Sequence, residues 1–587
     1  MVPDVLDIAT LPGLEVVPAP ARPLGSRGSR SDVADPAASE LTSDARGVLA
    51  RIPSWWRGQA LAAGLDGRWL DVEQALAAEP PVALAPTPED PEWSALSAEQ
   101  VGAAYVESLS ASTRSRHGRH YTPALLAAHL WKLVRQSLEL SPRTRVLPGL
   151  VCDPACGAGA LLLPALREHL HASYAEAPEL VLEKLPALME GIDADPAAVW
   201  IANVVLAAEM LPTLARVPTD RRQPLPALAR VGDGLAPPSR RARIVVMNPP
   251  YGRVRLSPAE RDRYAHVLYG HANMYGLFMA AGVDALDDHG VLAALVPTSF
   301  TSGRYSANLR SHLGEKAAMT AVTFVEDRSG VFGSVLQETC LATFERRKRR
   351  KTRIMSLGST ETAIASVKIQ KSAEPWVLPR RSDDAAIAAA ASAMTESMSS
   401  FGWSASTGPL VWNRRSEDLH ASPGPNRSFV VWAADLDGGV LHRDAARDSM
   451  RYMALTKPSD GKVMVLDRPA VLVQRTTAPE QSRRLVAALL CETALKELGG
   501  RVTVENHVNV LRSTAKDLVL SYEAMTRLLA TKALDQVMRC ISGSVAVSAY
   551  ELESIPLPSR DVVATWNALE GSALETAVAA AYRLNGS

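Results

Sequence analysis

The order of motifs along this sequence predicts an α/β fold with a mostly parallel sheet. An apolar run at residues 244–247 leads into Asn248-Pro249-Pro250-Tyr251. An earlier apolar stretch leads into Asp153 and a loop of small residues, and two more acids, Asp193 and Asp233, follow short segments of the same kind. Open α/β sheets bind their ligands beyond the carboxyl ends of the strands, so these four segments predict a ligand site built from strand ends.

The Asn248-Pro249-Pro250-Tyr251 turn has the groups needed to hold a planar amino group. Proline has no N–H donor and a fixed φ, so the carbonyl groups of this turn are held as hydrogen-bond acceptors. Asn248 adds a side-chain amide oxygen, and Tyr251 supplies a flat face for the ring that carries the amino group. The simpler interpretation is a turn that only ends a strand, and the neighbouring motifs favour the clamp.

The small-residue loop that follows the earlier apolar stretch reads Asp153-Pro154-Ala155-Cys156-Gly157-Ala158-Gly159. Its glycines allow a tight turn and let a ligand lie against the backbone. Dinucleotide enzymes use a related loop, but here the Gly-x-Gly-x-x-Gly pattern is incomplete. The acid before the loop would repel a pyrophosphate, whereas it suits a cationic or amine-bearing ligand.

Asp193 and Asp233 extend the predicted site along the next strands. Asp193 precedes Asp195-Pro196, which predict the N-cap and the first residue of a helix. An acid in this place typically accepts hydrogen bonds from ribose hydroxyls, although Asp193 comes 34 residues after Gly159, which predicts a long crossover helix. Asp233 has the chemistry to accept a purine amino group. Each acid taken alone is more often a helix cap or a solvated charge.

Together these motifs resemble a known family, the class I, S-adenosylmethionine-dependent N6-adenine DNA methyltransferases of restriction–modification systems. The resemblance covers about residues 110–350 and is closest to the gamma group, in which the target-recognition domain follows the catalytic domain. It includes a Tyr-Thr-Pro segment upstream of the glycine loop and three segments downstream of the Asn-Pro-Pro-Tyr turn. These segments lie at residues 118–123, 273–278, 296–300 and 329–332.

The resemblance implies a Rossmann-like sheet of seven mostly parallel strands and a role for each matching position. The cofactor-binding residues would be Tyr121, Thr122, Pro123, Asp153, Pro154, Ala155, Gly157, Gly159, Asp193, Asp233 and Gly234. Thr122 and Pro123 would contact the methionine end of the cofactor, Asp193 the ribose, and Asp233 the cofactor's adenine. The catalytic turn would be Asn248, Pro249, Pro250 and Tyr251, in which Asn248 and the Pro249 carbonyl accept hydrogen bonds from the target amino group. Tyr251 and Phe332 would stack on the target base.

The implied chemistry is methyl transfer to an adenine that has left the duplex, with no catalytic lysine, cysteine or metal. Two acceptors on the N6 hydrogens raise the electron density of the nitrogen, and in-line positioning supplies the rest. One position departs from the family pattern. Relatives often have a bulky apolar residue after the amino-binding acid, whereas this chain has Gly234 followed by Leu235. The residue that packs on the cofactor ring is therefore open.

Length and composition predict two structured domains. The chain has 587 residues and 47% hydrophobic residues. We expect a disordered tail at residues 1–50, because it is rich in Pro, Ala, Ser and Arg. A catalytic domain with an N-terminal helical part would span residues 51–350, a linker 351–400, and a mixed α/β target-recognition domain 401–587. In that last domain, residues 429–432 and 463–473 resemble strands, and residues 482–498 and 520–539 resemble helices.

Charge and cysteine content limit the partners and the compartment. A net charge of zero argues against indiscriminate coating of nucleic acid, although a local basic groove remains compatible with it. The basic run at residues 346–351 with Arg353 is either a solvated run between domains or a hinge that contacts phosphates. Five cysteines favour a reducing cytoplasm, and Cys152 and Cys156 lack further ligands for zinc. No uninterrupted apolar span of 18 residues is evident, so we expect no membrane association.

Two alternatives share the motifs. Methyltransferases that act on protein glutamine or on RNA also use an Asn-Pro-Pro-aromatic clamp, but the Tyr-Thr-Pro segment and the large C-terminal part argue against them. A DNA-binding subunit with an inactive methylase fold would not need the intact acids and clamp. The N-terminal region has no nuclease motif, so a separate cognate restriction endonuclease, another defence-system subunit or a specificity partner is compatible with the sequence. Double-stranded DNA is the expected substrate.

Overall fold

The computed structural model describes residues 41–83, 90–110, 113–114, 121–141, 143, 147–326, 338–346, 351–369, 373–442, 449–477 and 481–583. All of these residues fall in one compact unit of the chain. The first helix, α1 (Ser43–Ala62), begins within the range predicted as a tail, because the Thr42 side chain accepts a hydrogen bond from the Ala45 amide and caps it. The rest of that tail lies outside the described residues.

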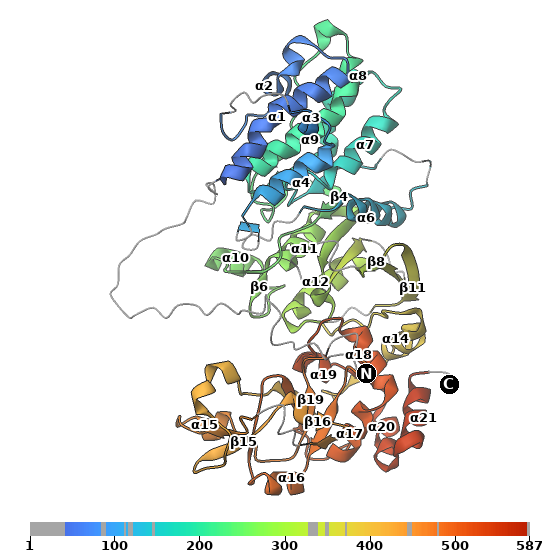
Figure 1. Cartoon of the computed structure of the whole chain (residues 1–587). Helices are drawn as coiled ribbons and strands as arrows, with labels where there is room; N and C mark the ends of the chain where they lie inside the picture. Colours follow the sequence, from blue (N-terminus) through green and yellow to red (C-terminus); the bar gives the residue numbers. More distant parts are fainter. Residues whose placement is uncertain are drawn as a thin grey trace, which may run out of the picture. The chain divides into compact units, whose positions relative to one another are not determined.

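A nine-stranded sheet forms the centre of the part of the described chain that precedes residue 373 (Figure 1). Its strand order is β11-β10-β8-β9-β7-β4-β1-β2-β3. Neighbouring strands from β3 to β7 run parallel, whereas β9 is antiparallel to both of its neighbours. The strands are β1 (Val151–Asp153), β2 (Met189–Asp193), β3 (Ala229–Val231), β4 (Ala242–Met247), β7 (Leu286–Pro297), β8 (Ala318–Val325), β9 (Thr339–Glu345), β10 (Thr352–Leu357) and β11 (Glu361–Val367).

The sheet has two strands more than the seven that the sequence predicts. The additional strands are β10 and β11, which form an antiparallel hairpin, and β10 pairs in parallel with β8. Both lie inside residues 351–400, the range predicted as a linker, where strand β10 is almost fully buried. Strand β9 lies between β7 and β8, and the hairpin extends the sheet beyond β8.

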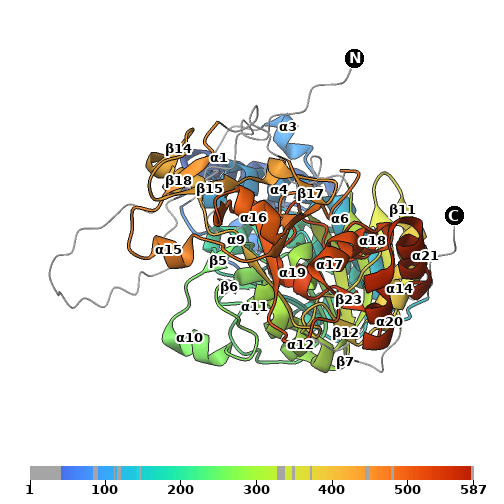
Figure 2. The ribbon, with the colours of Figure 1, turned by 90° about the horizontal axis from the view of Figure 1, so that it is seen from below.

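Alternating side chains of the central strands face two different cores, as expected for a sheet covered on both sides. On β4, Ile244 and Val246 pack with the helices of one face, and Val245 and Met247 with those of the other. The first face is covered by α1, α4 (Ala98–Ser108), α6 (Ala124–Ser137), α7 (Leu162–Ala172), α8 (Pro178–Leu188) and α9 (Pro196–Ala215). The second is covered by α11 (Met274–Ala285) and α12 (Ala307–Lys316), which lie side by side in Figures 1 and 2.

The connection between β1 and β2 contains two helices, α7 and α8, and not the single long crossover helix expected from the spacing. The break falls at residues 173–177, where Pro178 starts the second helix at its N1 position. The helix after β2, α9, begins as predicted, because Asp195 caps it and Pro196 is its first residue. By length and composition α9 could cross a membrane, but 78% of its most apolar window is buried inside the protein, as in a core helix.

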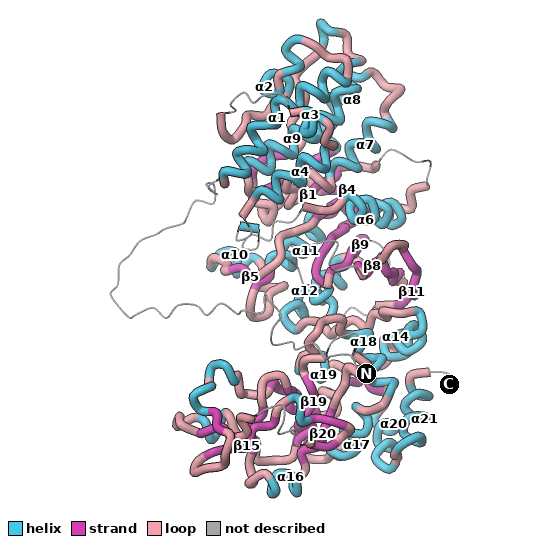
Figure 3. Tube along the Cα trace, viewed as in Figure 1, coloured by secondary structure: helices cyan, strands magenta, loops and turns pink. Residues whose placement is uncertain are grey.

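The C-terminal region, residues 373–583, mixes short strands and helices, as predicted (Figure 3). One sheet has the order β13-β22-β19-β20 and another the order β14-β18-β15-β21. Their strands are β13 (Trp403–Thr407), β22 (Val508–Ser513), β19 (Ala470–Gln474), β20 (Ala487–Leu490), β14 (Leu419–His420), β18 (Tyr452–Ala454), β15 (Arg427–Val431) and β21 (Val502–Val504). The longer helices are α14 (Ala385–Ala391), α17 (Tyr522–Leu529), α18 (Lys532–Ile541) and α21 (Gly571–Ala581).

The predicted elements of this region are confirmed in part. Strand β15 covers most of residues 429–432, and helices α17 and α18 divide residues 520–539 at Ala530 and Thr531. Strand β19 occupies only the end of residues 463–473. The helix expected at residues 482–498 is wrong: this segment holds strand β20, which pairs with β19, and the short helix α16 (Glu492–Glu497).

Candidate active site

A cavity of about 370 Å³ lies at the carboxyl ends of the parallel strands. Four strand ends reach it, through Asp153 after β1, Asp193 after β2, Asp233 beyond β3 and Asn248 beyond β4. The predicted residues that line it are Tyr121, Thr122, Asp153, Pro154, Ala155, Gly157, Asp193, Asp233, Gly234, Asn248, Pro250 and Tyr251. The sheet therefore brings together segments that are up to 130 residues apart in the sequence.

Four predicted residues are not among those that line the cavity. Pro123 is the N-cap residue of α6, and Pro249 lies within the turn after β4. Gly159 has φ +86°, and a Cβ added there would lie 3.4 Å from Ala202 of α9, so this glycine serves the close packing of helix against loop. Phe332 lies outside the described residues.

The glycine loop presents its backbone to the cavity at Gly157. This residue has φ +49°, and a Cβ there would meet no atom within 4 Å, because the position opens into free space. The Gly157 N–H donates to Asp193 Oδ2 at 2.9 Å, which ties the loop after β1 to the acid after β2. A ligand can thus approach the backbone where a side chain would stand.

Asp153 is a buried carboxyl group at the base of this cavity. It is 1% exposed, and its Oδ1 accepts a hydrogen bond from the Ala155 N–H at 3.0 Å. Burial raises the pKa of Asp153 to about 8; the Ala155 hydrogen bond opposes this shift and the charge of Asp193 adds to it. No Lys, Arg or His within the described ranges forms an ion pair with Asp153. A positively charged ligand would supply that partner.

Asp193 and Asp233 differ in how the backbone holds them. Asp193 is half-buried, and its second oxygen accepts from the Asp195 N–H at 2.9 Å. Asp233 is exposed, and its Oδ1 accepts from the Leu235 N–H at 2.9 Å. Both carboxylates line the cavity, and carboxylate oxygens can accept hydrogen bonds from hydroxyl or amino donors.

Gly234 is required by a close approach of two loops. A Cβ added there would clash with the carbonyl oxygen of Pro154 and would lie 2.9 Å from the ring of Phe278. The bulky apolar side chain that relatives often have after the amino-binding acid therefore has no room in this chain. Phe278 of α11 and Leu235 both line the cavity and supply apolar surface beside this glycine. Phe278 belongs to the segment at residues 273–278, for which the resemblance implied no particular contact.

The Asn248 amide is oriented by two side chains. Its Nδ2 donates to Thr122 Oγ1 at 3.0 Å, and its Oδ1 accepts from the Tyr251 hydroxyl at 3.2 Å. The Tyr251 hydroxyl also lies 3.1 Å from the Leu295 carbonyl of β7. Thr122, which the resemblance assigns to the cofactor, is 5% exposed and contacts the clamp itself. The Asn248 amide is thus held in one orientation at the edge of the cavity.

Tyr251 is anchored at its hydroxyl end and packs edge-on against Tyr275, with ring centroids 6.4 Å apart. Burial raises the pKa of Tyr251 far above its usual value, so the hydroxyl stays protonated and acts as a donor. Tyr121 also lines the cavity, and its buried hydroxyl has no hydrogen-bond partner among the described residues. Burial likewise raises the pKa of Tyr121, which keeps this unpaired group a donor.

Helix α4 contributes cavity residues that the sequence analysis missed. Tyr105, Val106 and Leu109 line the cavity, and the Tyr105 hydroxyl donates to Asp195 Oδ2 at 2.8 Å. Because Tyr105 precedes Asp195 by 90 residues, only the folded chain shows this contact. The local signal was a capping box at Ser97 and Gln100, which marks the start of α4 but says nothing of what its apolar face covers.

Comparison with known proteins agrees with this geometry. Residues 242–332, which include the Asn-Pro-Pro-Tyr turn, match the family described as Eco57I restriction-modification methylase. The chain is 23% identical over 343 residues to the Type II methyltransferase M.BsuBI of Bacillus subtilis, an alignment that covers 56% of this chain and 68% of that protein. It is also 23% identical over 330 residues to the Type II methyltransferase M.PstI of Providencia stuartii, covering 54% of this chain and 65% of that one. These matches support a restriction–modification methylase.

A solved structure shows the same fold over nearly the whole chain. The Type IIL restriction-modification enzyme MmeI, determined in complex with DNA, superposes with a TM-score of 0.50. The superposition covers 94% of this chain and 90% of MmeI at 13% sequence identity. The protein therefore has an α/β methyltransferase fold, as predicted, followed by a mixed α/β C-terminal region.

Proposed function

We propose that this protein is a site-specific DNA methyltransferase that transfers a methyl group from S-adenosylmethionine to N6 of an adenine flipped out of duplex DNA. The observation that carries the proposal is that the Asn248 amide, held by Thr122 and Tyr251, faces the same cavity as Asp153, Asp193 and Asp233. A clamp for a planar amino group thus adjoins acids suited to a cationic nucleoside. The matches to restriction–modification methylases support the same chemistry.

The cavity residues fit S-adenosylmethionine group by group. When bound, this cofactor supplies a methyl carbon made electrophilic by its sulfonium. The buried Asp153 carboxyl would lie near the positive charge, and the open backbone at Gly157 would leave room for the chain that bears it. Asp193 would accept from ribose hydroxyls and Asp233 from the purine amino group, while Phe278 and Leu235 would cover the ring. The Tyr121 hydroxyl is a donor for the ligand's carboxylate.

Asn248 acts on the target amino group. Its Oδ1 and the carbonyl of Pro249 accept the two N6 hydrogens, which localises the nitrogen lone pair along the line of attack. Thr122 prevents the amide from turning its NH₂ group toward the amino group, because Nδ2 already donates to the threonine oxygen. Positioning of this kind can lower the barrier by roughly 7–11 kcal/mol, so the turn needs no strong base.

The target adenine must leave the DNA duplex, because Asn248 lines a cavity. An amino group inside a duplex cannot reach Asn248, so the adenine must leave the stack at a cost of a few kcal/mol, which stacking on Tyr251 offsets in part. The C-terminal region would read the base edges of the recognition site, as an Arg-, Asn- and Gln-bearing domain can in the major groove. MmeI, which shares the fold, was solved with DNA. A cytoplasmic restriction–modification system, with a separate endonuclease or another defence subunit, is the setting we propose.

The first test is methyl transfer by the purified full-length chain. The protein is incubated with labelled S-adenosylmethionine and unmodified DNA, and the DNA is digested to nucleosides. We expect N6-methyladenine from the wild type. Asn248→Ala should lower the rate by about a hundredfold or more, the scale for loss of a preorganised hydrogen-bonding group, while cofactor binding measured by calorimetry persists.

Three other outcomes would change the proposal. Label on N4-methylcytosine would keep the clamp and overturn the target base. Label on added RNA or on protein would overturn DNA as the substrate. Absence of transfer, together with tight cofactor binding, would show that the chain alone does not recognise its target. A partner subunit would then be required.

A further inference from the structure

A second group of polar side chains lies on the face of the sheet covered by α11 and α12. It consists of His266, in the turn after α10 (Pro258–Arg263), Asp284 near the end of α11, and His312 within α12. One potential ligand atom from each residue lies within 4.8 Å of the other two. None of the three residues lines the methyltransferase cavity. Among the described residues, this is the group of His, Cys, Asp and Glu side chains with metal-binding geometry.

The centre of the group is a buried nitrogen without a hydrogen-bond partner. His312 is 8% exposed, and its Nε2 lies 3.2 Å from Asp284 Oδ1. That contact lacks the angles of a hydrogen bond, so Nε2 is left unsatisfied among the described residues. The ring of His266 lies over that of His312, with centroids 4.8 Å apart and the planes inclined by 59°. Two imidazoles and one carboxylate thus lie close together. The imidazole of His312 is buried, and its Nε2 lacks a hydrogen bond.

We propose that His266, Asp284 and His312 form a binding site for a divalent transition-metal ion, for which zinc is the natural probe. Imidazole nitrogen and carboxylate oxygen bind zinc at about 2.0–2.2 Å, which places neighbouring ligand atoms of a tetrahedron about 3.4 Å apart. The pair Asp284–His312 already has this spacing. His266 is exposed and can close the remaining distance by rotation of its side chain. A water molecule would complete the tetrahedron.

A metal ion here would join the turn after α10 to helices α11 and α12. His266 lies two residues after Tyr264, whose hydroxyl donates to the Leu235 carbonyl at 2.9 Å. Leu235 lines the cavity next to Gly234. The ion would therefore hold the segment after α10 against α11 and α12 and, through Tyr264, would support one wall of the cavity. The ion would act on the fold and not on the reaction, because none of its three protein ligands lines the cavity.

The test uses the full-length protein, without an affinity tag, after treatment with a chelator. Zinc chloride is titrated by calorimetry into the wild type, His266→Ala and Asp284→Asn. His289→Ala is the matched control, since His289 is an exposed histidine at the start of β7 and outside the group. We expect one zinc per chain in the wild type and the control. Removal of even an outer-shell partner of a metal costs about tenfold in affinity, so loss of a direct ligand should cost at least about tenfold.

Thermal melting gives an independent measurement. Zinc should raise the melting temperature of the wild type and of His289→Ala, and should leave that of His266→Ala and Asp284→Asn unchanged, because only a folded site binds the ion. His266 is exposed, so its replacement leaves the fold intact and keeps the test decisive. Absence of zinc binding to the wild type would overturn the proposal. Equal binding to all four proteins would also overturn it and place the ion elsewhere on the chain.

Discussion

Buried carboxylates have different surroundings in the two halves of the molecule. Asp153 in the catalytic sheet is 1% exposed and accepts one backbone hydrogen bond, but no described cation pairs with it. Asp435 in the C-terminal region is 3% exposed, and both of its oxygens lie 2.8 Å from Arg451 Nη1. A buried charge costs free energy unless it is paired. A carboxyl group buried without a partner therefore marks a place where a ligand completes the structure.

Other acids of the C-terminal region follow the pattern of Asp435. Arg415 contacts Asp460 at 2.8 Å, and its hydrogen bond lowers the pKa of Asp460 to about 2 although burial opposes this. Asp535 accepts hydrogen bonds from the Arg484 and Leu485 amides and from the Arg539 side chain. These pairs hold short strands and loops that have little regular structure of their own. These acids of the C-terminal region have partners within the protein, whereas Asp153 lines the cavity without a cationic partner among the described residues.

The largest expected effect is on stability, from Asp435→Asn. The substitution keeps the shape of the side chain but removes the negative charge opposite buried Arg451. Breaking one side of a buried ion pair costs about 3–5 kcal/mol, so we expect a fall of this size in the free energy of unfolding. Asp437→Asn, two residues on and exposed, is the control and should change stability by less than about 0.5 kcal/mol. Chemical denaturation measures both, and equal effects would contradict the role assigned to the pair.

Asp153→Asn should have the opposite effect on stability and a marked effect on binding. The asparagine retains an oxygen for the Ala155 N–H and removes the burial cost of a charge, so the free protein should be as stable as the wild type or more so. Loss of a charge-assisted contact of about 1.5–3 kcal/mol should weaken S-adenosylmethionine binding by about tenfold to a hundredfold. Calorimetry measures the binding, and Asp66→Asn, an exposed acid, is the matched control.

The pH dependence of stability separates this acid from the others. Burial raises the pKa of Asp153 to about 8, whereas an unfolded aspartate titrates at about 4. Between these values the folded state holds a proton that the unfolded state has released, so the wild type loses stability as the pH rises. Asp153→Asn lacks this loss, so its stability relative to the wild type should rise from about pH 4 to about pH 8. A constant difference across that range would show that Asp153 is ionised in the free protein.

The sequence predicts the cavity better than the sheet around it. Strand ends at residues 153, 193 and 248 are marked by an apolar run that stops at a polar residue, so their neighbourhood follows from topology alone. Strand β20 has no such mark. Its four residues are apolar, and a short apolar run does not distinguish strand from helix until a partner such as β19 is known. The hairpin β10–β11 was not predicted either, because the basic run before it indicated a segment between domains.

The contacts that orient the site could not be predicted for a different reason. Thr122 and Asn248 are 126 residues apart, and Tyr105 and Asp195 are 90 residues apart. Such pairs depend on how helices settle on the sheet, which hydrophobic periodicity leaves open. The room beside Gly234 is similar: the sequence shows a missing bulky side chain, but only the fold shows that the Pro154 carbonyl and Phe278 take its place.

Thr122→Val should give a smaller effect than Asp153→Asn, confined to turnover. The valine has the shape of threonine but no hydroxyl, so the Asn248 Nδ2 loses its acceptor and the amide can rotate. One neutral hydrogen bond is worth about 0.5–1.5 kcal/mol, so kcat should fall by about twofold to tenfold. Thr122→Ser keeps the hydroxyl and should retain the wild-type rate. A rise in KM for the cofactor with unchanged kcat would instead assign Thr122 to cofactor binding.

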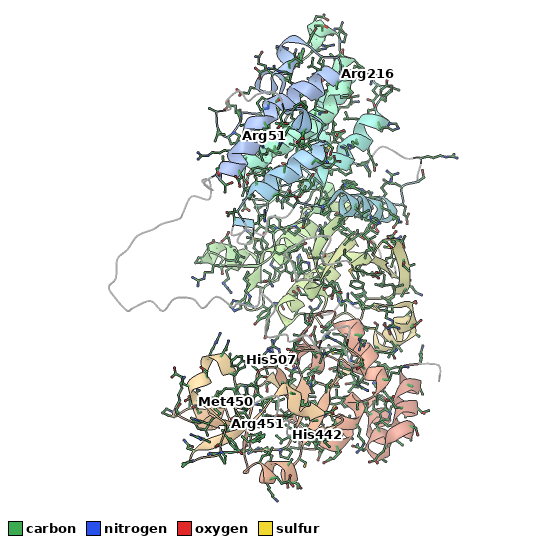
Figure 4. The ribbon with its side chains drawn as sticks, in the orientation of Figure 1. Arg51, Arg216, His442, Met450, Arg451 and His507 are labelled. Atoms are coloured by element: carbon green, nitrogen blue, oxygen red, sulfur yellow. The ribbon has the colours of Figure 1, made fainter. Side chains whose placement is uncertain are left out.

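The smallest effect is expected in the C-terminal region, at His507 (Figure 4). His507 Nδ1 lies 2.6 Å from Oε1 of Glu505, which is 1% exposed. This hydrogen bond raises the pKa of His507, against burial and the nearby Arg475. A raised histidine pKa stabilises the fold below the unfolded value of about 6.5, and this contribution disappears as the pH rises through the folded value.

His507→Gln should therefore destabilise the protein at pH 6 and have almost no effect at pH 9. Half of the His507 side chain is in solvent, which limits the loss to about 1 kcal/mol or less. His442→Gln is the control, because His442 is an exposed histidine of the same C-terminal region (Figure 4). Unfolding measured at both pH values should show a pH-dependent difference for His507 alone. An equal loss of stability at pH 6 and pH 9 would mean that His507 supports Glu505 by packing and not by charge. Glu505 would then lack the cationic partner that the other buried acids of the C-terminal region have.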